Sequence, residues 1–203
     1  MQLYQTYTEL LKRTNFTPTS IPKNWEDLEK AYASKSRYYH KLTHIEAMIS
    51  SFEQYKNELE FPNEVLYSIF YHDIIYKATR KDNEEKSAAF ALQILPKKTT
   101  LSSALVYKMI CATKLHQKSE INDINWLIDF DLKILSSDYS SYENYTQQIR
   151  KEYKIYPDLL YKPGRKKALL HFLENDFIYQ TKTFREKHET QARTNIQKEI
   201  KTL

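Results

Sequence analysis

Apolar residues recur every three or four positions along almost the whole chain, which is the spacing of helices that bury one face. The sequence lacks sustained alternation of apolar and polar residues and lacks hairpin turn dipeptides, the two patterns that mark strands. We therefore predict an all-α helical bundle. Its expected helices are about 2–13, 25–35, 44–59, 63–76, 82–95, 101–115, 123–135, 139–154, 164–174 and 184–201.

Two of these helices begin with the spacing of a capping box. Thr43 and Glu46 are placed to cap the 44–59 helix, and Asp82 and Glu85 to cap the 82–95 helix. Pro62 stands just before the 63–76 helix, where a proline is tolerated because the first turn has unbonded N–H groups.

The pair His72-Asp73 lies at the end of an apolar run, where neither side chain belongs without compensation. In a helix over 63–76, Asp73 falls in the middle of the apolar face and His72 at its margin. A divalent metal would compensate both side chains, because imidazole nitrogen and carboxylate oxygen are good ligands. A lone histidine at a helix edge is also common as surface or satisfied core, so the pair alone is weak support.

Two further ligands are available elsewhere in the chain. His44 falls in the first turn of the 44–59 helix, at the edge of its buried stripe. In the 123–135 helix, Asp131 shares a face with the apolar residues, whereas Asp129 points to a different side. We expect Asp131 to enter the core. We expect Asp129 either to hold a metal ligand in place without binding the metal itself, or to be exposed.

The numbers of glycine and cysteine residues exclude several kinds of binding site. Gly164 is the only glycine, so the glycine-rich loops that bind nucleotide phosphates through backbone amides are excluded. Cys111 is the only cysteine, which excludes an internal disulfide and a multi-cysteine zinc site. A chain of this kind that handles phosphates must use a metal and side chains.

The length of 203 residues suits one domain, 1–203. No apolar run has the length of a membrane span and the N-terminus does not resemble a signal peptide, so we expect a cytoplasmic protein that is not bound to a membrane. The net charge of +5 is spread among acidic residues. It favours anionic small ligands over a stable nucleic-acid complex, and it leaves open a homodimer.

The order His44, His72-Asp73, Asp131 resembles the H…HD…D signature of the HD superfamily of metal-dependent phosphohydrolases. The surrounding sequence is similar to a small bacterial branch of predicted phosphohydrolases in that superfamily. The similar stretches are RYYHKLTH at 37–44, YHDIIY at 71–76, DNEEKSA at 82–88, ATKLH at 112–116, DFDLKIL at 129–135, IRKEY at 149–153 and GR at 164–165. The resemblance extends from about residue 25 to 200.

The resemblance implies an HD-domain-like bundle in which His44, His72, Asp73 and Asp131 hold a divalent metal ion, whether Mn, Mg, Co, Ni, Fe or Zn. That ion would activate water to hydrolyse a phosphomonoester, phosphodiester or pyrophosphate bond in a small phosphorylated metabolite or nucleotide. The alternative is a metal-binding helical protein with a regulatory or ligand-binding role and little or no turnover.

Other residues are candidates for the reaction itself. Asp73, Glu84 or Glu85 would orient the attacking water or move a proton, although Glu85 is equally suited to capping a helix. The candidates for substrate binding are Arg37, His40, Lys114, His116, Arg150 and Arg165. For the cations among them the alternative is surface salt bridging, and for His40 it is stacking among tyrosines. His171 and His188 are assigned no role.

Two carboxylates near each other in an apolar setting repel, so without metal we expect a raised pKa for Asp73 or Asp131. Metal binding should then release protons and tighten between mildly acidic and neutral pH.

Overall fold

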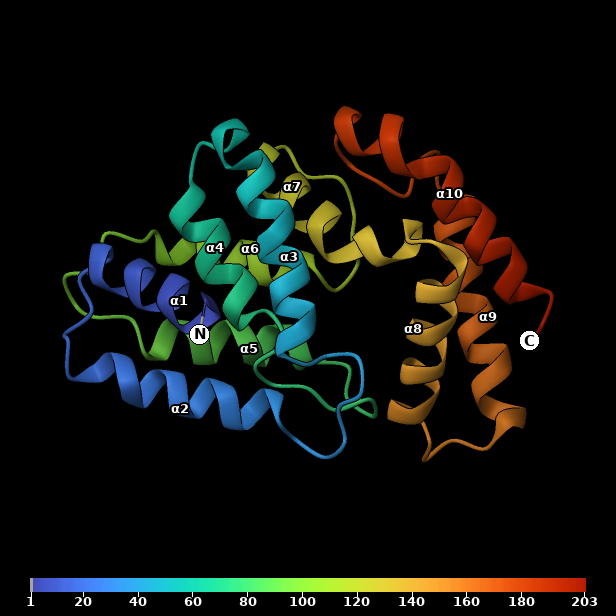
Figure 1. Cartoon of the computed structure of the whole chain (residues 1–203), viewed down its shortest axis with the longest axis horizontal. Coiled ribbons are helices and arrows are strands. Elements are labelled where there is room, and N and C mark those ends of the chain that lie inside the picture. Colours follow the sequence, from blue (N-terminus) through green and yellow to red (C-terminus); the bar gives the residue numbers. More distant parts are fainter. Residues whose placement is uncertain (1) are drawn as a thin grey trace.

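The computed structural model describes residues 2–203, and within that range every regular element is a helix, which confirms the predicted all-α class (Figure 1). The helices are α1 (Gln2–Arg13), α2 (Ser20–Tyr32), α3 (Leu42–Tyr55), α4 (Pro62–Tyr71), α5 (Asn83–Gln93), α6 (Ser103–Ala112), α7 (Asn122–Leu132), α8 (Tyr139–Glu152), α9 (Asp158–Glu174) and α10 (Lys182–Ile200). Two short 3₁₀ helices, η1 (Lys56–Glu58) and η2 (Lys133–Ser136), follow α3 and α7. None of the helices in the described range is both long enough and apolar enough to cross a membrane.

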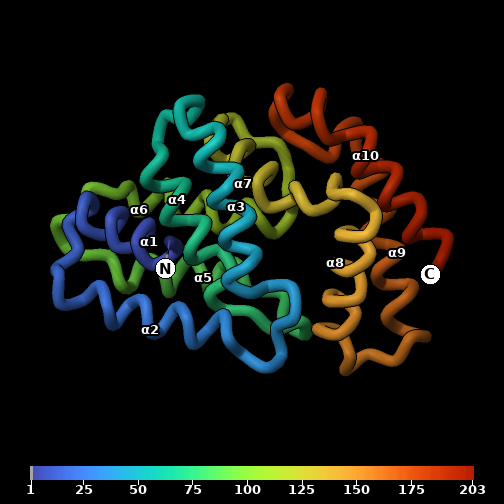
Figure 2. The backbone as a smooth tube through the Cα atoms, in the orientation of Figure 1, coloured from blue at the N-terminus to red at the C-terminus, as the bar shows by residue number. Residues whose placement is uncertain are grey.

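Helix α4 is at the centre of the first part of the molecule. It packs against α1, α3, α5, α6 and α7, and its residues from Glu64 to Tyr71 are all buried. Helices α8, α9 and α10 lie together at the other end, and the backbone passes into this group through η2 (Figure 2). Because η2 also packs against α7 and α10, it joins the two groups.

Buried tyrosines form much of the core, and their hydroxyl groups find partners inside it. Tyr32 donates to the carbonyl of Phe70 at 3.1 Å, and Tyr67 donates to the carbonyl of Ala91 at 2.8 Å. Tyr7 and Tyr71 bond to each other through their hydroxyls. A tyrosine-rich chain can therefore bury these large rings without leaving polar groups unsatisfied.

Several predicted helix starts differ from the structure. Helix α2 begins at Ser20, five residues before the predicted start. Neither predicted capping box forms. Helix α3 begins at Leu42, so Thr43 lies inside it, and Asp82 is the N-cap residue of α5 but its side chain pairs with Lys86 at 2.8 Å and makes no capping bond. Helix α9 begins at Asp158, six residues before the predicted start, and includes both Pro163 and Gly164.

The predicted end of the central helix is also wrong. Helix α4 ends at Tyr71, so His72 is its C-cap and Asp73 lies in the turn beyond it. Side chains from elsewhere hold the segment that follows. Ser87 accepts from the amide of Ile75 and donates to its carbonyl, at 3.1 and 3.2 Å, and Asn83 forms the same pair of bonds with Lys77.

The strongest of these anchors is Arg37, whose guanidinium is buried. It donates to the carbonyl of Asp73 at 2.7 Å and to that of Ile74 at 3.0 Å, and it also reaches the carbonyl of His40 at 3.2 Å. Tyr32 and Tyr76 lie against the same guanidinium. The prediction that Arg37 binds substrate is therefore not supported, because the side chain is buried and both of its terminal nitrogens donate to backbone carbonyls.

We expect Arg37→Met to lower the free energy of unfolding by about 3 kcal/mol, because it leaves buried carbonyl groups without donors. Urea denaturation followed by circular dichroism measures this. Arg13→Met, which removes an exposed bond to Asn63, is the control and should change stability by less than about 1 kcal/mol. Equal effects of the two substitutions would contradict the anchoring role.

Candidate metal centre

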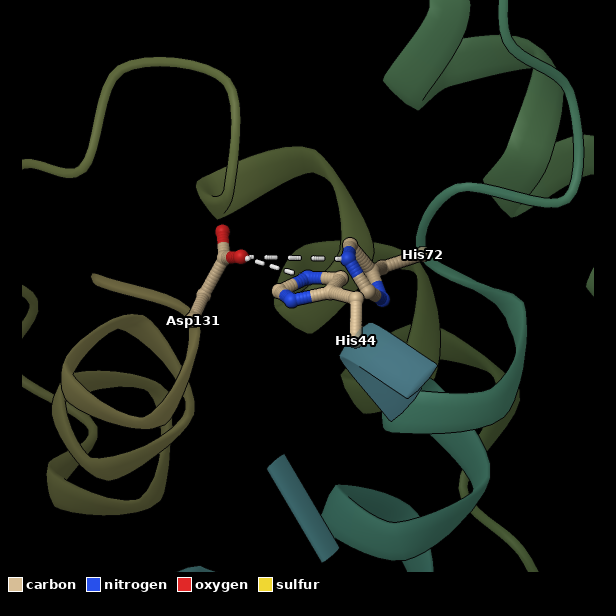
Figure 3. Close-up of side chains that lie close together, drawn as sticks. All are labelled: His44, His72 and Asp131. Carbon is tan, nitrogen blue, oxygen red and sulfur yellow. Dashed lines mark ion pairs between the residues drawn. The ribbon is translucent and has the colours of Figure 1, made fainter. Parts of the chain in front are cut away.

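Three helix ends bring His44, His72 and Asp131 together (Figure 3). His44 lies in the first turn of α3, His72 caps α4, and Asp131 is next to the last residue of α7. Asp131 Oδ1 is 3.1 Å from His44 Nε2 and 3.9 Å from His72 Nε2. The three potential ligand atoms lie within 4.8 Å of one another, which confirms that these three predicted residues converge.

Hydrogen bonding sets the direction in which His72 faces. Its Nδ1 is 2.9 Å from the carbonyl oxygen of Ile69, so Nδ1 carries the proton and donates, and Nε2 points into the cluster. The Nε2 atoms of His44 and His72 are both buried, and neither has a well-aligned hydrogen-bond partner among residues 2–203. Once its Nε2 has lost its proton, an imidazole with a fixed orientation and a buried nitrogen has the usual form of a metal ligand.

Asp73 lies beside this cluster. Its Oδ2 is 3.2 Å from His72 Nε2 and 3.8 Å from His40 Nε2, but it is not one of the three residues whose ligand atoms are mutually close. Asp73 as a fourth ligand stays a prediction.

The second oxygen of Asp131 is held by His116. Asp131 Oδ2 lies 3.1 Å from His116 Nε2, so Oδ1 is left facing the two histidines. His116 has φ of 53°, a left-handed conformation that is unfavourable for a residue with a side chain. Gln180 donates from its side chain to the carbonyl of His116 at 2.9 Å and helps to hold this backbone.

The predicted difference between Asp129 and Asp131 is partly wrong. Asp129 is fully buried, and its carboxylate accepts from the amides of Gln180 and Thr181 at 2.6 and 2.8 Å and from the hydroxyl of Thr181 at 2.6 Å. It therefore anchors the start of α10 and is not exposed. Asp131 has a side chain that is 15% exposed and faces the histidines.

Glu152, at the end of α8, is a residue that sequence reasoning missed. Its Oε1 accepts from the consecutive amides of Tyr38, Tyr39 and His40, at 2.6, 2.8 and 3.1 Å. Its Oε2 accepts from the hydroxyl of Tyr76 at 2.8 Å and lies 2.6 Å from His40 Nδ1. Glu152 thus fixes His40 with its Nε2 toward Asp73. The signs of Glu152 in the sequence were its place in the IRKEY stretch at 149–153 and its acidic charge among basic neighbours.

The cluster borders a cavity of about 580 Å³, which we call the front cavity. The predicted residues that line it are His40, His72, Asp73, Glu84, Lys114, His116, Asp131 and Arg165. Arg80, which was not predicted, lines it too. Its volume is in the range of small-molecule sites, about 300–1,000 Å³.

Several predicted residues are occupied by other contacts. Glu85 makes an ion pair with Lys114 at 2.6 Å and is not part of the lining. Arg150 is also outside the lining, and pairs with Asp158 at 2.7 Å. Arg165 lines the front cavity but pairs with Glu199 at 2.8 Å.

Charges in the cluster shift the pKa values in opposite directions. Burial alone would lower the pKa of His72, but the carboxylates of Asp73 and Asp131 raise it to about 9. Burial lowers the pKa of His44, and Asp131 offsets this only in part. Although burial alone would raise them, the pKa values of Asp73 and Asp131 are lowered by the neighbouring histidines. The expected rise in a carboxylate pKa is therefore wrong.

Comparisons of the chain with protein-family models, with curated proteins and with solved structures give no match. The resemblance to the HD superfamily therefore stays a prediction, and the candidate site depends on its own geometry.

The two aspartates of α7 should respond differently to substitution. We expect Asp131→Ala to abolish measurable Mn²⁺ binding, because it removes the oxygen that faces both histidines. Asp129→Ala should keep Mn²⁺ affinity but lower the free energy of unfolding by about 3 kcal/mol, because it leaves buried donors at the start of α10 unsatisfied. Isothermal titration calorimetry measures the first quantity and urea denaturation the second. Loss of metal binding in a folded Asp129→Ala protein would show that this division is wrong.

Metal affinity should depend on pH through His72. With a folded pKa of about 9, against an ordinary value of 6.5, the metal-free protein holds a proton on His72 at neutral pH. A metal ion must displace that proton, so log K for Mn²⁺ should rise by about one per pH unit from pH 7 and level off above pH 9.

Calorimetry in buffers of different ionisation enthalpy tests this directly. About one proton should be released per Mn²⁺ bound at pH 7, and fewer as the pH approaches 9. A proton release that is the same at both pH values would contradict the assignment to His72.

Proposed function

We propose that this protein is a divalent-metal-dependent phosphohydrolase that acts on a small phosphorylated metabolite or nucleotide. The observation that carries the proposal is a pair of buried, unpartnered histidine nitrogens facing Asp131 Oδ1 at the edge of the front cavity. Buried polar atoms without partners are unfavourable, and a cation bound between the two nitrogens and the carboxylate would satisfy both nitrogens.

His44, His72 and Asp131 would hold the metal, with Asp73 as the fourth predicted ligand. A mixed set of imidazole and carboxylate suits Mn, Fe, Co, Ni or Zn better than Mg, which favours oxygen ligands. When bound, the ion would lower the pKa of a water molecule and polarise a phosphoryl oxygen.

Cationic side chains of the front cavity would bind the phosphate. Arg80 and Lys114 both line it, and no carboxylate lies within ion-pair distance of Arg80 in the described range of residues 2–203. Their positive charge would offset the charge that develops on the phosphoryl oxygens during hydrolysis.

Two residues suit proton transfer. Glu84 lines the cavity, and burial raises its pKa, so its carboxylate is suited to accept a proton from the attacking water. Burial alone would lower the pKa of His40, but Asp73 and Glu152 raise it, so its Nε2 is suited to donate a proton to the leaving oxygen. Glu152 would act as the positioning residue for that donor.

Hydrolysis can be tested with p-nitrophenyl phosphate, bis-p-nitrophenyl phosphate and a panel of nucleotides, with and without Mn²⁺. We expect one of these bond types to be cleaved in a reaction that EDTA abolishes, and we expect His72→Ala to lower kcat/KM by about 100-fold or more. His171→Ala, in the exposed part of α9, is the matched control and should keep full activity.

Metal binding without hydrolysis of any of these bonds would favour the alternative of a regulatory protein. Activity that persists in His72→Ala would show that the reaction does not use this cluster.

A further inference from the structure

A second cavity, which we call the rear cavity, borders the same cluster of candidate metal ligands. Its volume is about 420 Å³. Tyr39, Asp131 and Ile134 line both cavities, whereas His72 lines only the front and His44 only the rear. The candidate metal cluster therefore lies in the wall that the two cavities share, which we call the partition.

The rear cavity has one lysine without a carboxylate partner. Lys133, in η2, donates to the hydroxyl of Ser51 at 3.2 Å, and within residues 2–203 no carboxylate lies within ion-pair distance of it. The only carboxylate in the lining is that of Asp131, whose oxygens face His44 and His116. The positive charge of Lys133 is therefore not neutralised by a direct ion pair.

His188 of α10 adds to the polar character of this cavity. The hydroxyl of Ser136 donates to the carbonyl of Lys133 at 3.0 Å, so the contact of 2.9 Å between Ser136 Oγ and His188 Nδ1 has the imidazole as donor. Burial lowers the pKa of His188, and the charges of Lys133 and Lys187 lower it further. The surroundings of His188 are thus positive.

Hydroxyl groups complete the lining. Thr43 and Ser50, from the outer side of α3, face the cavity together with Ser136 and Ser137. The hydroxyls of Ser136 and Ser137 donate to backbone carbonyls, whereas those of Thr43 and Ser50 have no such bond within residues 2–203. Lys133 with the hydroxyls of Thr43 and Ser50 is a set that can bind a small oxyanion.

We propose that the rear cavity binds inorganic phosphate. The binding itself needs only the residues named here. The source of the phosphate depends on the proposed function, since hydrolysis at the partition would release phosphate beside Asp131, next to Lys133. The organic product could then leave through the front cavity while phosphate occupies the rear.

Phosphate binding by the full-length protein in EDTA tests the proposal, because phosphate bound to a metal is then removed from the measurement. We expect equilibrium dialysis with labelled inorganic phosphate to give a Kd that rises at least tenfold in Lys133→Met and about two- to threefold in Thr43→Val. Lys133→Arg, which keeps the charge, should bind within about threefold of the unmodified protein. Lys182→Met, at an exposed position of α10, should bind normally.

Lys114→Met distinguishes the two cavities. If Lys114→Met weakens phosphate binding and Lys133→Met does not, the anion binds in the front cavity and the proposal is overturned. Equal weakening in Lys133→Met and Lys182→Met would mean that only net charge matters, which also overturns it. Circular dichroism of each variant checks folding, and the exposed Thr43→Val substitution provides the test if Lys133→Met does not fold. None of these outcomes requires hydrolysis, so the proposal and the enzymatic function can fail separately.

Discussion

The buried guanidinium of Arg37 joins the two irregular segments on which the candidate site depends. Its bonds to the carbonyls of Asp73 and Ile74 hold the turn after α4, and its bond to the carbonyl of His40 holds the loop before α3. A planar group with several donors in fixed directions can bridge two loops in this way, which a lysine could not. The positions of His40 and Asp73 are therefore coupled, although the two residues are far apart in the chain.

Two kinds of buried or partly buried carboxylate in this protein differ in their partners. Asp123, Asp129 and Glu152 accept hydrogen bonds from backbone amides at the start of a helix or in a loop, and so they satisfy donors that would otherwise be buried alone. Asp73 and Asp131 instead face histidine nitrogens. Glu152 also contacts a histidine nitrogen, His40 Nδ1, but only Asp73 and Asp131 direct oxygen atoms at the buried Nε2 atoms of His44 and His72. This separates structural acids from candidate metal ligands.

Local sequence patterns predicted what depends on local contacts. The helices follow from apolar periodicity. The convergence of His44, His72 and Asp131 was expected from helical phase together with the resemblance to the HD superfamily. Other contacts between distant segments could not be predicted from these patterns. The apolar sequence continues past Tyr71, and the helix ends there because Arg37 and Ser87 bond the backbone of the next turn. In the same way, Asp129 is buried by the start of α10, which helical phase within α7 does not reveal.

The balance of charge at the cluster connects metal and anion binding. His72 holds a proton because two ionised carboxylates lie next to it, and a bound divalent ion would replace that proton. The exchange adds one net positive charge at the partition between the two cavities. In a partly buried site that change is only weakly screened, so it would favour an anion on either side. The site would thus bind phosphate more tightly with the metal than without it. The size of this difference in affinity would depend on Asp73 and Asp131, because their charges keep the proton on His72 in the metal-free protein.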